Sequence, residues 1–136
     1  MSSLELRRDL VILACAISAG IHGALVPAHF EEGTGAGLGF VAATVALAAI
    51  VVSLTVRPAG VIALAAAAAV LLGLLASYLL AVTTGLPLLH PEPEAVDGLA
   101  LATKAIEAGG LLAALDLSWR ARPGVASAPQ PKGLPT

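Results

Sequence analysis

The sequence predicts an all-α fold, a four-helix transmembrane bundle with its N- and C-termini in the cytoplasm. The 136-residue chain is 58% hydrophobic and only 12% charged, whereas soluble domains are about 45–50% apolar and about 25% charged. Its apolar residues gather into four stretches of about 20 residues, the length at which a helix crosses the hydrocarbon core of a bilayer. Its Lys and Arg residues, apart from one inside the fourth stretch, flank these stretches on one side only. These three observations define the fold class.

The four expected spans follow one another with short connections. We place them at about residues 10–29, 36–56, 59–83 and 95–118. A helix needs roughly 20 apolar residues to span the membrane, and each stretch provides them. The fourth stretch differs from the others because it contains four charged residues: Asp97, Lys104, Glu107 and Asp116.

The distribution of basic residues predicts the orientation. The two loops on one side, residues 31–35 and 85–94, contain neither Lys nor Arg. The positive-inside rule therefore places residues 1–9 and the tail 120–136 in the cytoplasm, and we expect a multi-pass protein of a bacterial plasma membrane. A three-span alternative without the fourth stretch would put the basic residues that follow it on the wrong side. The tail is rich in Pro, Gly, Ser and Ala and is expected to be disordered.

A glycine-rich run precedes the second span. Residues 33–39 hold two overlapping Gly-x-x-x-Gly spacings. Small residues at this spacing allow helix backbones to approach closely in lipid. The run therefore favours a tight bundle, and it would equally suit packing against a partner protein.

A polar layer lies within the expected spans. Glu107 comes ten residues after Asp97, about 15 Å deeper in a helix and so near the middle of the membrane. Lys104 and Glu107 are three residues apart and can pair along one helix face. His22 in the first span and Tyr78 in the third are the expected partners of this layer. Because charged residues in spans are costly, the layer is either a structural ion pair or has a role with a proton, an ion or a ligand.

Histidines and carboxylates also gather where the spans reach the outer side. His22 and His29 are seven residues apart, so they share a helix face if the helix continues past Pro27. Imidazole and carboxylate groups suit Zn, Cu and Fe ions. We therefore predict an outer transition-metal site with these candidate ligands: His29, Glu32, His90, Asp97 and, at a deeper level, His22. The alternative is a solvated acidic rim.

A family resemblance is carried by one spaced set of residues. The set is His22, Pro27, His29 and Glu32, then Thr84-Gly85-Leu86-Pro87, His90, Asp97 and Glu107. With it, the chain resembles small four-span bacterial membrane proteins of actinobacterial type that carry an outer His/acid motif. The resemblance implies four helices and an outer His/acid site, and it implies no particular activity.

Three functions remain open from the sequence. The first is an integral membrane protein that binds a transition-metal ion at the outer site. The second is a small accessory subunit of a larger membrane complex, for example a respiratory one, or a homo-oligomer. The third is a proton or ion relay through His22, Lys104 and Glu107. A net charge of −2 without a basic stripe argues against a nucleic-acid partner, and no nucleophile–base pair predicts catalysis.

Overall fold

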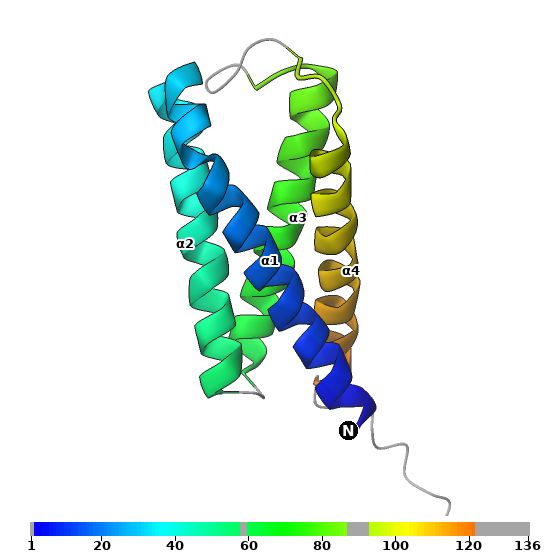
Figure 1. The fold of residues 1–136 in the computed structure, drawn as a ribbon. Helices are drawn as coiled ribbons and strands as arrows, with labels where there is room; N and C mark the ends of the chain where they lie inside the picture. Colours follow the sequence, from blue (N-terminus) through cyan, green and yellow to red (C-terminus); the bar gives the residue numbers. More distant parts are fainter. Residues whose placement is uncertain (1, 58–59, 87–92, 122–136) are drawn as a thin grey trace, which may run out of the picture.

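The computed structural model describes residues 2–57, 60–86 and 93–121. It contains four helices, which are α1 (Ser3–Glu32), α2 (Thr34–Val56), α3 (Val61–Thr83) and α4 (Gly98–Arg120) (Figure 1). Each is long and apolar enough to cross a membrane. The predicted all-α four-helix fold is confirmed, whereas the cytoplasmic position of the two termini stays a prediction.

The helix bounds differ from the predicted spans mainly around α1. This helix begins at Ser3, well before residue 10, because Ser2 and Glu5 form a capping box. The Ser2 hydroxyl accepts a hydrogen bond from the Glu5 amide at 3.2 Å, and the Glu5 carboxylate accepts one from the Ser2 amide at 2.6 Å. Such reciprocal bonds satisfy amides that a helix start leaves unpaired. The predicted segment 1–9 is thus largely the first turns of α1.

The predicted loop 31–35 is reduced to a single residue between two helices. Glu32 ends α1, Thr34 begins α2, and only Gly33 separates them. The Gly33 amide donates to the His29 carbonyl at 3.1 Å, and the Gly33 carbonyl accepts from the Gly37 amide at 3.1 Å. We name this end of the bundle the Gly33 end. Most of the glycine-rich run 33–39 is therefore the first turn and a half of α2.

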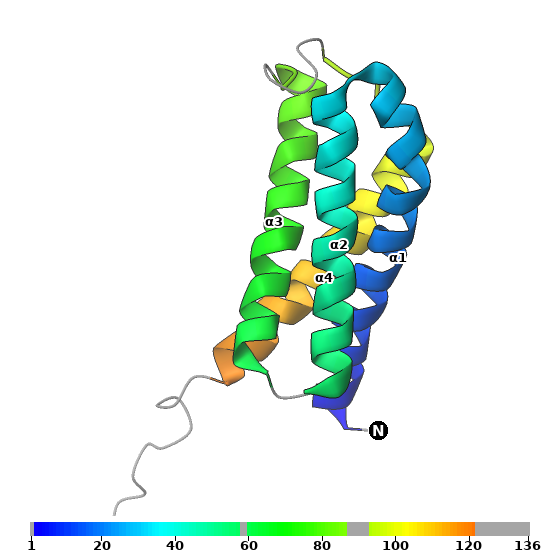
Figure 2. The same cartoon turned by 90° about the vertical axis from the view of Figure 1, so that its left-hand side faces the viewer.

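The helices form an up-down-up-down bundle. α1 packs along α2 and α4, and α3 packs along α4 and α2, so neighbours in the bundle are antiparallel (Figures 1 and 2). α2 and α3 come closest at the end where residues 57–60 connect them, which we name the Arg57 end, and they diverge toward the Gly33 end (Figure 1). Of the predicted tail, only residues 120 and 121 are described. Of the loop 85–94, residues 87–92 lie outside the described part.

The apolar core occupies the middle of the bundle and its Arg57 half. Hydrocarbon tails are as apolar as these side chains, so close packing and not water exclusion holds the helices together. Large apolar side chains also cover the outer faces of all four helices. The chain is therefore a multi-pass membrane protein whose outer faces meet lipid. The buried cluster consists of Val11, Cys15, Leu47, Ile50, Leu54, Leu64, Ala67, Leu71, Ala114 and Leu117.

An ion-pair cluster joins α1 to α4 at the Arg57 end. Arg7 near the start of α1 pairs with Asp116 near the end of α4. Arg120 also reaches Asp116, with its Nε 2.9 Å from the same carboxylate oxygen. Because the three side chains are partly exposed, this cluster orients the helix ends and contributes little to stability.

Candidate functional site

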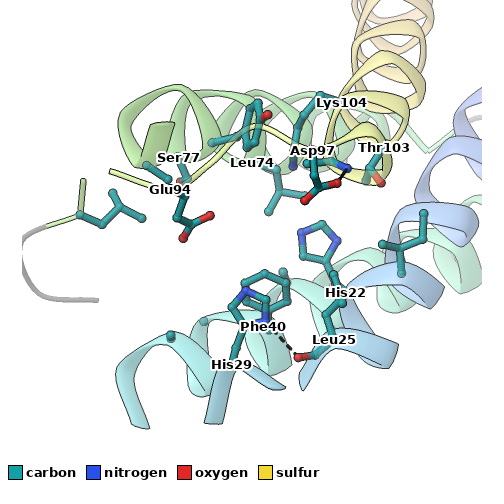
Figure 3. Close-up of a pocket in the computed structure, with 18 of the residues that line it drawn as sticks. His22, Leu25, His29, Phe40, Leu74, Ser77, Glu94, Asp97, Thr103 and Lys104 are labelled. Carbon is teal, nitrogen blue, oxygen red and sulfur yellow. Dashed lines mark hydrogen bonds between the residues drawn. The ribbon is translucent and has the colours of Figure 1, made fainter. Parts of the chain in front are cut away.

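A cavity of about 580 Å³ lies between the helices in the Gly33 half of the bundle (Figure 3). All four helices contribute to its wall, together with Leu86, residues 93–95 and Asp97. Its size is that of pockets that enclose small organic ligands. Most of the residues in the wall are apolar, and the wall also contains polar and titratable residues. The titratable residues in the wall are His22, His29, Glu32, Tyr78, Glu94, Asp97 and Lys104.

Two histidines of α1, His22 and His29, line this pocket, and each uses its Nδ1 atom in a bond to the backbone of its own helix. The Nδ1 atom of His22 is 2.9 Å from the Ser18 carbonyl, and the Nδ1 atom of His29 is 3.0 Å from the Leu25 carbonyl. A carbonyl oxygen only accepts, so each Nδ1 must carry the hydrogen. In the neutral form, each Nε2 atom is then left with its lone pair. The pocket therefore has two imidazole acceptors with fixed tautomers.

The helix continues through Pro27, as required for His22 and His29 to share a face. Their rings both lie against the ring of Phe40 from α2. The centroid of Phe40 is 3.5 Å from that of His29, in a stacked arrangement, and 5.1 Å from that of His22. The shared aromatic contact fixes both rings on one wall. Figure 3 shows His22 reaching across the cavity toward Asp97.

A buried polar network lies behind the pocket residues His22 and Lys104. Glu107 on α4 is fully buried. Its carboxylate accepts a hydrogen bond from the Ser18 hydroxyl at 2.6 Å and pairs with the Lys104 ammonium at 2.7 Å. The Ser18 hydroxyl is also 3.2 Å from Nδ1 of His22. Ser18 thus connects the pocket histidine with the buried carboxylate.

The polar layer predicted from the sequence is therefore present, with one more member. Lys104 and Glu107 pair along α4 as their spacing predicted, but His22 reaches Glu107 through Ser18 and not directly. Tyr78 lies beside Lys104, whose Nζ atom is 5.5 Å from the centre of the phenol ring, within the range of a cation–π contact. Sequence reasoning missed Ser18, although its spacing of four residues from His22 was a usable signal.

The candidate metal ligands do not come together as one site in the described part of the chain. Within residues 2–57, 60–86 and 93–121, no three His, Cys, Asp or Glu side chains lie close enough to hold an ion. The Nε2 atom of His29 is 3.9 Å from a Glu32 carboxylate oxygen, whereas Asp97 caps α4 by accepting from the Ala100 amide at 2.8 Å. His90 lies outside the described residues. The transition-metal site stays a prediction, and the His29–Glu32 pair is its best defined part.

Negative charge predominates in the pocket. Glu32, Glu94 and Asp97 line it, while the charge of Lys104 is balanced by Glu107. The pocket also has an inner limit, because the apolar core begins beyond Glu107. An acidic, largely apolar pocket of this kind favours ligands that combine positive charge with apolar surface.

Comparisons of the chain with protein-family models, with curated proteins and with solved structures found no match.

Proposed function

We propose that this membrane protein binds a small organic cation, an amine with an apolar body, in the pocket at the Gly33 end. The proposal depends on one observation, namely that three carboxylates and two imidazole acceptors line a cavity whose other walls are mostly apolar. The predicted orientation would open this pocket to the extracytoplasmic side. Binding and not catalysis is proposed, because the Ser18 hydroxyl, which donates to the Glu107 carboxylate, is fully buried and does not line the pocket.

The ammonium group of such a ligand would find its acceptors on two facing walls. On one wall, His22 offers an Nε2 lone pair, because its Nδ1 hydrogen is used by the Ser18 carbonyl. Across the cavity, the carboxylates of Asp97 and Glu94 point into the same space (Figure 3). An ammonium group has three N–H donors and no acceptor. Two walls of acceptors therefore complement it.

The apolar part of the ligand would be held by the remaining walls. Leu25 and Leu74 line the cavity from α1 and α3, and the Phe40 ring lines it from α2. Each buried methylene contributes about 0.8 kcal/mol when it leaves water. The apolar walls would supply affinity, and the acceptors would select for positive charge.

The test uses hexylammonium as the probe, with hexanol as its neutral analogue, on purified protein in detergent. Calorimetric titration should show binding of hexylammonium that is at least about tenfold tighter than that of hexanol, as expected for one charge-assisted hydrogen bond. The key variant is Asp97→Asn, which removes the charge but keeps a good helix cap. We expect it to weaken hexylammonium binding by about tenfold.

The matched control is Glu31→Gln, the same change of charge at an exposed residue that does not line the pocket. Its hexylammonium affinity should equal that of the wild type. Equal affinity for hexanol and hexylammonium, or equal losses in the two variants, would contradict the proposal.

The second candidate is a transition-metal ion, favoured by the His29–Glu32 pair. His29 donates its Nδ1 hydrogen to a backbone carbonyl, which is how metal-binding histidines are commonly oriented. Elemental analysis of the wild type beside His29→Ala, after incubation with Cu, Zn and Fe salts, decides this point. Near-stoichiometric metal that is lost in the variant supports the ion site. Metal-free wild type excludes it.

The other two functions gain less support. A relay across the membrane needs a polar path on both sides of Glu107, and among the described residues the side toward the Arg57 end is the apolar core. Membership of a larger complex, or of a homo-oligomer, stays a prediction.

A further inference from the structure

One wall of the pocket opens between α2 and α3. Gly39 on α2 and Ser77 on α3 both line the cavity, and both are solvent-exposed in the isolated chain. The wall of the cavity is thus only one residue thick at Gly39 and at Ser77. The two helices diverge toward this end of the bundle (Figure 1). We therefore place the opening of the pocket on its α2–α3 side, where the wall is thinnest.

This opening lies at the depth of the hydrocarbon core. Gly39 is five residues from the start of α2, and Ser77 is six residues from the end of α3. At about 1.5 Å per residue, both lie roughly 8–9 Å from the Gly33 end of their helices. Since these helices span the membrane, what lies outside the opening is lipid and not water.

Small side chains keep the opening wide. The α2 residues in the pocket wall include Ala36, Gly39 and Ala43, three or four residues apart and so on one helix face. A Cβ atom built on Gly39 would meet no atom within 4 Å. Space is thus available beside Gly39 for a slender chain.

We infer that the ligand is a single-chain amphiphilic amine that enters sideways from the bilayer. This rests on the proposed function and specifies its ligand class. The ammonium group would bind beside Asp97 and His22, and the alkyl chain would pass between Gly39 and Ser77 into the lipid. Charge complementarity selects the amine head, and an opening within the hydrocarbon layer selects the apolar tail.

The experiment uses dodecylamine with a photoreactive diazirine at the end of its chain, incorporated into lipid nanodiscs with the protein. After irradiation, mass spectrometry maps the labelled residues. We expect labels concentrated on α2 and α3 beside Gly39 and Ser77, and we expect added hexylammonium to reduce labelling by competing for the head-group site. Labels spread evenly over the four helices, insensitive to hexylammonium, would overturn the inference.

A double variant blocks the opening and a single variant controls for it. Gly39→Leu combined with Ser77→Leu should reduce labelling by about tenfold, since each leucine fills part of the passage. Gly73→Leu places the same side chain on an exposed position of α3 that does not line the pocket and has open space around it. Its labelling should match the wild type. Unchanged labelling in the double variant would overturn the inference.

The two levels of the proposal fail differently. If hexylammonium neither binds nor competes, the proposed function itself is wrong. If hexylammonium binds in an Asp97-dependent manner while dodecylamine labelling ignores the α2–α3 opening, only the lateral route and the amphiphilic ligand class are wrong. The labelling map of the wild type does not depend on whether the double variant folds. It therefore tests the lateral route even if the double variant is unstable.

Discussion

At the scale of single residues, Glu107 stands out because it is an acidic side chain that is completely removed from solvent. It is fully buried near the middle of α4 and depends on two partners, the Lys104 ammonium and the Ser18 hydroxyl. A buried charge pair is held by geometry, because the cost of removing both charges from water offsets much of their attraction. Removing one partner is therefore more harmful than removing both.

This difference gives a prediction for Lys104. The substitution Lys104→Met leaves an unpaired buried carboxylate and should lower the free energy of unfolding by about 3–5 kcal/mol. The double variant Lys104→Met with Glu107→Leu removes the unpaired charge and should recover most of this loss. Unfolding of the detergent-solubilised protein by denaturant, followed by circular dichroism, measures both. If the double variant is as unstable as the single one, the charge is not the cause.

At the scale of elements, the contact between α1 and α4 depends on a glycine. A Cβ atom built on Gly110 would lie 2.5 Å from the Cβ atom of Ala14 and 3.2 Å from a Leu71 methyl. The first distance is too short for two carbon atoms and the second is tight, so the two helix backbones approach as closely as they do because Gly110 has no side chain. This contact brings α4, with Glu107 one turn away, against Ser18 of α1.

The neighbouring glycine provides the matched test. Gly110→Ala should destabilise the bundle by about 1–3 kcal/mol, the usual cost of overpacking, and should weaken ligand binding because Glu107 and Ser18 move apart. Gly109→Ala adds the same methyl where nothing lies within 4 Å, and should leave thermal stability in detergent unchanged or slightly raised. Equal stabilities for the two variants would show that the close approach is not needed.

At the scale of the whole molecule, the bundle is divided into a packed half and an open half. The Arg57 half contains the apolar core and the Arg7–Asp116 pair. Toward the Gly33 end, α2 and α3 diverge and the pocket lies between all four helices. The apolar core closes the end of the pocket that faces the Arg57 end. This architecture suits a binding site that is accessible from one side of the membrane.

The orientation of the molecule follows from its basic residues and can be measured. Fluorescent protein fused after residue 136 should fluoresce, because both termini are predicted to be cytoplasmic. Alkaline phosphatase fused after residue 94 should be active, because the loop 85–94 is predicted to lie outside. The reversed pattern would place the pocket on the cytoplasmic side and would contradict the extracytoplasmic site.

Composition and spacing along the chain were sufficient to predict the four helices, the presence of His22 and His29 on one helix face and the pairing of Lys104 with Glu107. These features depend on local periodicity, and a helix repeats every 3.6 residues wherever it lies. Only the tertiary structure decided which side chains of different helices meet. It placed Phe40 against both histidines and inserted Ser18 between His22 and Glu107. The pocket likewise depends on how the helices diverge. This divergence follows from the packing of small residues between helices, and no periodic pattern in the sequence predicts it.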